Sequence, residues 1–521
     1  MINIKDKKTN CCGCSACIQV CPEKCIIMLE DDEGFRYPEA DRDKCINCRK
    51  CDEVCPVSRQ FSCTENNEEY PVAIGVCHRD DAVRYSSSSG GAFTLLASRI
   101  LDLGGAVYGC CIDEKMLVRH IRVDNPADLD FLRGSKYVQS NIDDIYSMVK
   151  NDIDEGKEVL FTGTPCQAAG LFSFIGENKA SNLYIVDFIC HGVPSPGVFR
   201  DYLENAEKKT GDRIVEYRFR LKDHGWSSSG LQLGTEYRTE TGKVIRKYPA
   251  YRDAYMNGFL DDAFLRPVCY ECPFKEIRKV YSDFTIADFW GVRRVSPKLY
   301  DKKGTSLVLI QNEHARKLWN EVRENCVYEE VSADSALKRN RSIDTSARRK
   351  KNRELFFPDY RNKGYGYVEK KYMSGLVWGW HRILRSLDRI RQFVKFALVG
   401  CSNTIINLAV YYTCIYFGLH YLLAYTLGFA VSVCNAFYWN NRYVFTNKQE
   451  KSLLKAFCKV VLSYGFSFAL SVLLMGVLVD ILNISQLLAP LIKMTVTIPI
   501  NFVLNKVWAF KDRDQAESRN N

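Results

Sequence analysis

The last quarter of the chain is dominated by long apolar stretches, whereas the rest alternates between short apolar and polar runs. Four apolar stretches cover residues 396–418, 421–439, 460–482 and 486–504. Each is close to the roughly 20 residues that cross the hydrocarbon core of a bilayer as a helix. We therefore expect residues 396–512 to form an all-α transmembrane domain of four helices. A helical bundle buried in a soluble protein is the alternative for such a pattern.

Between residues 70 and 355 the apolar positions form short runs of strand length, separated by stretches with helical spacing. The runs that indicate buried strands are "VAIGVC", "AVYGCCI", "EVLFTG", "LYIVDFIC" and "SLVLIQ". Because strands that alternate with helices are typical of α/β or mixed α+β folds, we expect a central domain of this class over residues 70–355. A polar linker, Ser62–Pro71, separates it from residues 1–60. The pattern thus predicts a multidomain protein.

The segment 356–395 is basic and contains one amphipathic stretch. Apolar residues repeat at helical spacing over residues 376–390, and Arg382, Arg385 and Arg389 take the other face. This pattern is typical of a helix that lies in the membrane interface. We expect a basic linker followed by such a helix.

Basic residues lie on only one side of the four apolar stretches. The chain has 72 Lys and Arg against 62 Asp and Glu, for a net charge of +10. Basic residues precede the first stretch, fill the loop after the second and follow the last. The positive-inside rule predicts that basic segments face the cytoplasm. We therefore expect a multi-pass protein of the cytoplasmic (inner) membrane, with the N-terminal domains, the middle loop and the C-terminus in the cytoplasm. We expect the lipid bilayer, and not nucleic acid, as the partner of these charges, because no RNA- or DNA-binding motif accompanies them.

Cysteines near the N-terminus form two runs of identical spacing. The runs are Cys11-x2-Cys14-x2-Cys17-x3-Cys21-Pro22 and Cys45-x2-Cys48-x2-Cys51-x3-Cys55-Pro56. In such runs three close thiolates wrap one 4Fe-4S cubane, and the fourth cysteine ligates the other cluster. We predict a first cluster held by Cys11, Cys14, Cys17 and Cys55, and a second held by Cys45, Cys48, Cys51 and Cys21. Cys12 and Cys25 are then uncoordinated, and structural zinc is the alternative.

The cysteine runs resemble bacterial-type two-cluster ferredoxins over residues 5–60, which implies a ferredoxin-like α+β head over residues 1–60. Residues 1–10 lack the apolar segment of a signal peptide, so we expect this head in the reducing cytosol. There the 23 cysteines act as metal ligands and buried thiols and do not form disulfides. Paired clusters carry single electrons without bond chemistry, so we also expect a partner cofactor.

Two motifs of the central domain suit a phosphate-bearing cofactor. Small residues stand before a helix expected over residues 93–101, namely Ser88, Ser89, Gly90 and Gly91. Backbone N–H groups at such a helix start can bind a flavin pyrophosphate; a Ser-capped helix after a glycine turn is the alternative. The second motif, "LRGSKYVQS", places Arg133 and Lys136 beside Tyr137. These residues suit a phosphate and a ring, and equally a solvated turn.

A third set of cysteines is spread over the central domain. Its members are Cys166, Cys190, Cys269 and Cys272. Cys166 falls in the first turn of a helix that Thr164 can cap, and Cys269 and Cys272 form a C-x2-C pair. A third 4Fe-4S cluster accounts for the set, while zinc and inert buried thiols are the alternatives.

Five motifs in order, from "SSGGAFTLL" to "CYECPF...SDFTIADFWGV", resemble the beta-subunit family of coenzyme F-420 hydrogenases and dehydrogenases over residues 70–310. The resemblance implies FAD and iron–sulfur clusters. It implies a flavin site that includes Ser89, Gly90, Gly91 and Lys136, and cluster ligation by the third cysteine set. It does not specify the substrate. His191, next to Cys190, is the candidate proton donor, or else it only hydrogen-bonds a loop carbonyl.

The apolar tail contains an internal repeat. "AFYWNNRYVF" (436–445) matches "NFVLNKVWAF" (501–510), which predicts a parallel repeat of two spans. The tail resembles the GtrA-like family over residues 390–512, which implies a polyprenyl-phosphate-linked sugar as partner in cell-surface polysaccharide synthesis. Lys493, inside the fourth stretch, could pair with a lipid phosphate or extend to the headgroups. Asn403 and Asn407 are candidate lipid-carrier contacts, although interhelical hydrogen bonds explain them better.

These features predict a membrane-anchored iron–sulfur flavoprotein oxidoreductase. Single electrons would pass from a ferredoxin-type donor through the clusters to FAD, and then to a substrate of lipid-linked sugar metabolism. One alternative is a GtrA-type translocation protein with a redox-sensing portion. Another is an enzyme that uses coenzyme F-420.

Overall fold

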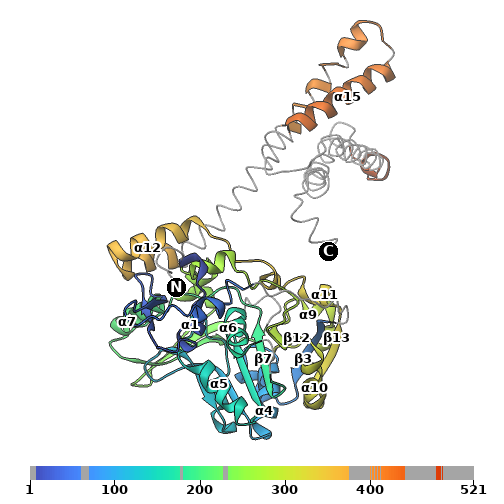
Figure 1. Ribbon diagram of the computed structural model, residues 1–521. Helices are drawn as coiled ribbons and strands as arrows, with labels where there is room; N and C mark the ends of the chain where they lie inside the picture. The colour runs from blue at the N-terminus through green and yellow to red at the C-terminus, as the bar shows by residue number, and fades with distance from the viewer. Residues whose placement is uncertain are drawn as a thin grey trace. The chain divides into compact units, whose positions relative to one another are not determined.

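The computed structural model describes residues 8–59, 70–176, 180–226 and 233–374, and parts of 399–439 and 474–484. The chain forms two compact units, Met1–Trp378 and Gly379–Asn521 (Figure 1). The head and the central domain therefore belong to one unit, although the sequence separates them by a polar linker.

The head has two short helices and a two-stranded sheet. Strands β1 (Ile26–Glu30) and β2 (Arg36–Ala40) pair antiparallel, and helices α1 (Ala16–Gln19) and α2 (Lys50–Glu53) each lie within a cysteine run. The residue before each helix has a left-handed backbone, at φ 64° for Ser15 and φ 61° for Arg49. The two cysteine runs thus share one backbone path, as their identical spacing predicts.

The central domain is built on an eight-stranded mixed sheet with the order β13-β3-β12-β11-β7-β6-β4-β5. Its strands are β3 (Val72–His78), β4 (Ala106–Ile112), β5 (Val118–Val123), β6 (Val159–Gly163), β7 (Leu183–Phe188), β11 (Phe284–Asp288), β12 (Ser306–Ile310) and β13 (Cys326–Val331). Strands β4, β6, β7 and β11 run parallel at its centre. All five strands expected from the sequence are present, and the prediction of a mixed α/β domain is confirmed.

Helices cover both faces of this sheet (Figure 1). On one face α4 (Ala92–Asp102) and α10 (Glu313–Val322) pack over a core that includes Leu160 and Val186. On the other face α5 (Ile145–Asp154) and α6 (Pro165–Ile175) pack over Phe161 and Ile185. Neighbouring residues of β6 and β7 thus point into opposite cores, as in a strand buried on both sides.

Smaller elements surround the sheet. Strands β8 (Ile214–Leu221), β9 (Gly234–Thr239) and β10 (Val244–Lys247) form an antiparallel sheet, against which α7 (Pro196–Thr210) packs. Helices α8 (Ala254–Leu260), α9 (Val292–Val295), α11 (Ala333–Leu337), α12 (Lys351–Lys363) and α13 (Tyr365–Val368) complete the unit. Phe356, Phe357 and Met373 are buried, so the packed structure continues to residue 374, beyond the boundary expected at residue 355.

The second unit is described only in part. Helical residues between 399 and 417 are followed by α15 (Tyr421–Trp439), and several of their large apolar side chains are exposed. No helix among the described residues meets both the length and the hydropathy required to cross a bilayer. The expected interfacial helix, the fourth apolar stretch and Lys493 lie outside the described residues, as does most of the third stretch.

Candidate iron–sulfur and flavin sites

The head brings its cysteines together in the two predicted groups. Electrostatic interactions join the thiols of Cys11, Cys14, Cys17 and Cys55. The second group surrounds a cavity with an empty volume of about 430 Å³, which is lined by Cys21, Cys25, Cys45, Cys48 and Cys51. The thiols of Cys21 and Cys25 are 3.5 Å apart. Each group therefore contains the four cysteines that the spacing assigns to one cluster, and the second group has Cys25 in addition.

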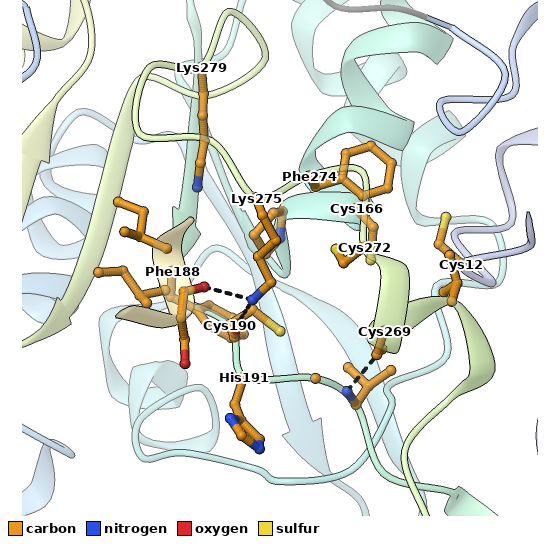
Figure 2. Close-up of a pocket in the computed structure, with 17 residues that line it drawn as sticks. Cys12, Cys166, Phe188, Cys190, His191, Cys269, Cys272, Phe274, Lys275 and Lys279 are labelled. Carbon is orange, nitrogen blue, oxygen red and sulfur yellow. Dashed lines mark hydrogen bonds between the residues drawn. The ribbon is translucent and has the colours of Figure 1, made fainter. Parts of the chain in front are cut away.

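The third cysteine set lines a second cavity, which has an empty volume of about 520 Å³. Cys166 lies in the first turn of α6, which follows β6 after Thr164, and Cys190 follows β7. Both therefore lie at the carboxyl ends of neighbouring parallel strands. Cys269 and Cys272 approach from the loop after α8, and Figure 2 shows all four thiols around the cavity. Open α/β sheets bind their ligands at this edge.

The thiols surround open space, and this arrangement suits a multi-iron cluster. Within the described ranges no group of three His, Cys, Asp or Glu side chains is arranged to hold a single metal ion. Four sulfur donors facing a cavity are the ligand set of a 4Fe-4S cluster. The residues present therefore fit clusters in the cavities of the second and third sets.

Two lysines line the cavity of the third set. The Lys275 ammonium donates hydrogen bonds to the carbonyl oxygens of Cys190 and Ser342. The Lys279 ammonium lies 2.6 Å from the buried Asp187 carboxylate. Fixed positive charge beside thiolates offsets part of the negative charge that a cluster with four thiolate ligands brings.

Buried Arg266 fastens the first cysteine run to the central domain. Its Nε donates to the carbonyl oxygen of Cys11 at 2.7 Å, and its guanidinium lies 4.2 Å from the centre of the Tyr37 ring. Gln139 donates to the carbonyl oxygen of Cys12 at 2.9 Å. The head is therefore held in a fixed position on the central domain.

Helix α6 joins the first and third cysteine sets. Cys166 and Gly170 are four residues apart, so they lie on the same face of the helix. A Cβ atom on Gly170 would lie 2.9 Å from Cys14 Cβ and 2.8 Å from the Tyr146 hydroxyl. The glycine thus permits close approach of Cys14, a member of the first set, to the helix that carries Cys166.

Gly170→Ala is expected to disturb the first cluster, because overpacking in a filled core costs about 1–3 kcal/mol. The iron content of anaerobically purified protein should fall, together with its thermal stability. Gly366→Ala is the matched control, since no atom lies within 4 Å of its added Cβ. Equal iron content and stability in both variants would contradict the close contact.

The two predicted flavin motifs lie side by side. The hydroxyls of Ser88 and Ser135 are 2.7 Å apart, and the ring of Tyr137 stacks on Phe259 at 4.9 Å. Lys136 donates to the carbonyl oxygens of Phe131 and Arg133, and burial lowers its pKa to about 8. Arg133 binds Thr94 and Asp130. The structure therefore gathers the residues around Ser88 and Lys136 in one region.

The glycines of this loop are explained by packing within the protein. A Cβ on Gly90 would lie 2.2 Å from the Val76 carbonyl oxygen, and one on Gly91 would lie 2.9 Å from His78 Cβ. Ser89 is buried, and its hydroxyl donates to the carbonyl oxygen of Thr305 at 2.6 Å. The Gly-Gly pair lets the loop cross strands β3 and β12, so it is not by itself a sign of a ligand.

Lys222 lies buried under the same loop. Its buried ammonium donates to the carbonyl oxygens of Arg84, Ser89 and Lys303. Burial, with the nearby charges of Arg220 and Arg84, lowers its pKa to about 7. Both arginines pair with aspartates, whereas neither Lys222 nor Lys136 has a carboxylate partner in the described part of the chain. Burial disfavours the charged form of both lysines, and an anionic cofactor beside them would favour that form.

His191 lines the cavity of the third set and forms a hydrogen-bonded pair with an acid. Its Nε2 lies 2.5 Å from the Asp262 carboxylate, and Lys350 lies 3.1 Å from the same carboxylate. Asp262 is buried and His191 is partly exposed. The partner of His191 is therefore a carboxylate and not the loop carbonyl considered from the sequence.

The asparagines of the tail contact each other. Asn435 of α15 donates to the Asn403 side-chain oxygen at 2.7 Å, and the Asn407 side chain occupies the space beside Gly428. These contacts agree with interhelical hydrogen bonding for Asn403 and close helix packing for Asn407.

Several residues of the sites could not be identified from the sequence. Lys222, Lys275, Lys279 and Arg266 are separated from the motifs in sequence and meet the sites only through the fold. Cys12 and Cys25 were recognised as spare thiols, yet each lines one of the two cavities. The only feature of the sequence that pointed to this role is that Cys12 and Cys25 lie close to cluster ligands along the chain.

Comparison with known proteins divides the chain into three parts. Residues 10–58 match the family described as "4Fe-4S dicluster domain". Residues 156–336 match the C-terminal part of the beta subunit in the family described as "Coenzyme F420 hydrogenase/dehydrogenase". Residues 395–510 match "GtrA/DPMS, transmembrane domain". These matches support an iron–sulfur oxidoreductase with a membrane domain.

Individual relatives match parts of the chain. The uncharacterized membrane protein YngA of Bacillus subtilis is 25% identical over 25% of this chain and 87% of its own length. The uncharacterized membrane protein YwcD of the same organism is 31% identical over 22% of this chain and 94% of its own length. Among solved structures, the chain is similar to a chain of the F420-reducing NiFe hydrogenase complex from Methanosarcina barkeri, which was solved as a xenon derivative. The TM-score is 0.36 and the sequence identity is 15%. The match covers 58% of this chain and 92% of that chain.

The thiol sets, the parallel-sheet edge and the family matches agree. The chain is similar to the 4Fe-4S dicluster domain over residues 10–58, to the coenzyme F420 hydrogenase/dehydrogenase beta subunit over residues 156–336, and to the GtrA/DPMS transmembrane domain over residues 395–510.

Proposed function

We propose that this protein passes single electrons through three 4Fe-4S clusters to FAD, and from FAD to a substrate attached to a polyprenyl-phosphate carrier at the membrane. The observation that carries the proposal is the packing of Cys14 against α6, the helix that also presents Cys166. Two cysteine sets from distant parts of the sequence thereby become neighbours. Neighbouring clusters are what a chain of one-electron steps requires.

The solvent exposure of the cysteines supports an order in which electrons reach the clusters. Cys48 of the second set is exposed, whereas Cys14 of the first set and the neighbouring Cys12 are buried. A one-electron donor protein of the ferredoxin type would therefore reach the second cluster first. Electrons would then pass to the first cluster and to the third.

The ligand assignments follow the thiol groups. Cys11, Cys14, Cys17 and Cys55 would hold the first cluster, and Cys21, Cys45, Cys48 and Cys51 the second. Cys166, Cys190, Cys269 and Cys272 would hold the third. Rapid mixing of the protein with a one-electron donor should bleach the cluster absorbance before the flavin absorbance, and simultaneous or reversed bleaching would contradict this order.

FAD would couple these one-electron steps to a reaction of the substrate. Ser88, Lys136 and Lys222 support a site for its phosphates near the start of α4, and Tyr137 offers an aromatic face. His191, oriented by Asp262, would supply a proton to the reduced substrate.

Lys136→Met is expected to weaken FAD binding at least about tenfold, because a hydrogen bond to a charged group contributes about 1.5–3 kcal/mol. The iron content should stay at the level of the unmodified protein. FAD released by denaturation is measured by fluorescence. Lys150→Met, which alters an exposed ion pair with Asp154, is the control, and equal FAD content in the two variants would contradict this site.

The matched GtrA/DPMS domain supports the choice of a lipid-linked sugar as substrate. It would keep the redox unit at the membrane and bind the polyprenyl-phosphate carrier, with Lys493 as the candidate contact to the lipid phosphate. The positive-inside pattern supports a cytoplasmic location of both chain ends.

A second candidate substrate is coenzyme F420, and the match of residues 156–336 favours it. Oxidation of reduced F420 by the anaerobic protein distinguishes the two. Turnover of F420 comparable to that of the physiological reaction would replace the lipid-linked sugar as the redox partner.

A further inference from the structure

Cys12 lies between the first and third cysteine sets. It is 3% exposed and lines the cavity of the third set. Its thiol interacts with the thiols of Cys14 and of Cys166, one from each set. In Figure 2, Cys12 is seen on one side of Cys166 and Cys190 on the other.

The cavity of the third set has one thiol more than a cluster requires. It is lined by Cys12, Cys166, Cys190, Cys269 and Cys272, whereas a 4Fe-4S cluster takes four cysteines. The last four interact electrostatically with one another. These four complete a ligand set, and Cys12 remains as the fifth thiol.

Ligand sulfurs carry no proton when they bind a metal. With clusters on Cys14 and Cys166, the Cys12 thiol is therefore the group among the three that has a hydrogen to donate. Its carbonyl oxygen accepts from Gln139 at 2.9 Å, so the backbone of Cys12 is held in place between the two sets. Hydrogen bonds to cluster sulfurs are among the factors that set reduction potentials.

We propose that Cys12 is a positioning residue between the first and third clusters. It donates its single thiol hydrogen to the ligand sulfur of Cys14 while its own sulfur lies against Cys166, and so promotes electron transfer between the clusters. In the step one electron leaves the reduced first cluster and enters the oxidised third cluster. No bond forms or breaks, and Cys12 keeps its proton. The electron comes from the one-electron donor that reduces the head. This inference rests on the cluster assignments of the proposed function.

The test compares Cys12→Ala and Cys12→Ser with the unmodified protein, all purified anaerobically as full chains in detergent. Iron and sulfide content, redox titration followed by EPR spectroscopy, and freeze-quench kinetics after mixing with dithionite are measured. Cys326→Ala is the control, because Cys326 is a buried thiol that donates to the carbonyl oxygen of Arg323 and lines neither cavity.

Cys12→Ala should keep the full iron content. The first cluster, which Cys14 ligates, should become harder to reduce. Its reduced-to-oxidised ratio at a fixed potential should fall by about tenfold, which corresponds to about 59 mV for one electron. Reduction of the third cluster should slow. Cys12→Ser retains a donor and should recover most of both effects, and Cys326→Ala should match the unmodified protein.

Two results would overturn this role of Cys12. Loss of about four iron atoms in Cys12→Ala would show that Cys12 is a ligand. Full iron content with unchanged potentials and rates would show that its contacts have no effect on transfer. Unmodified protein without iron would instead refute the proposed function itself, so the two failures are distinguishable.

Discussion

Cys272→Ala is expected to remove about four of about twelve iron atoms per chain and to stop electron delivery to the proposed FAD. Cys272 lines the cavity at the sheet edge together with the other three cysteines of the third set, and a 4Fe-4S cluster is held by four cysteines. The head retains its own two groups of thiols, so its clusters should persist. Iron analysis gives the first effect, and flavin bleaching after mixing with a one-electron donor gives the second.

Cys326→Ala is the matched control for this change. Its thiol is also buried but lies outside both cavities, so iron content and flavin bleaching should stay unchanged. If Cys272→Ala retains all of its iron and reduces its flavin at the normal rate, the third cluster does not lie in this cavity.

Lys279→Met is expected to destabilise the central domain by about 3–5 kcal/mol, because it leaves a buried charge without its partner. The side chains of Lys279 and Asp187 are 1% and 0% exposed and lie 2.6 Å apart. Lys279 contacts Asp187 Oδ2, and Asp187 Oδ1 has no hydrogen-bond partner among the described residues. The midpoint of urea unfolding, followed through the loss of cluster absorbance in the full chain, should fall accordingly.

The double variant Lys279→Met with Asp187→Leu should recover most of the lost stability, because it removes both charges. Lys150→Met changes an exposed pair and should cost less than about 1 kcal/mol. If Lys279→Met and Lys150→Met unfold at the same urea concentration, the Lys279–Asp187 pair is not a buried pair that stabilises the domain.

The sequence predicted those features that depend on local spacing. The cysteine runs specify their own backbone path, since Ser15 and Arg49 adopt the same left-handed conformation. Likewise Thr164 predicted the start of α6, and thus the position of Cys166 in its first turn. Apolar runs of strand length indicated the central strands, because parallel strands are buried on both faces.

Features that depend on contacts between distant segments could not be predicted. Arg266 meets Cys11 only because the head packs against the loop after α8. The glycines at 90 and 91 suggested a phosphate cradle, yet strand backbone and side-chain atoms fill the space beside them. Spacing marked Cys12 as surplus, and only the fold shows that it lies between two cysteine sets.

Mössbauer spectroscopy of anaerobically purified, iron-57-enriched full chain is the most direct test of the central claim, that three sets of thiols hold 4Fe-4S clusters. The account predicts about twelve iron atoms per chain, all with the spectral signature of 4Fe-4S clusters. Zinc in place of iron, or iron sufficient for only the two clusters of the head, would contradict it.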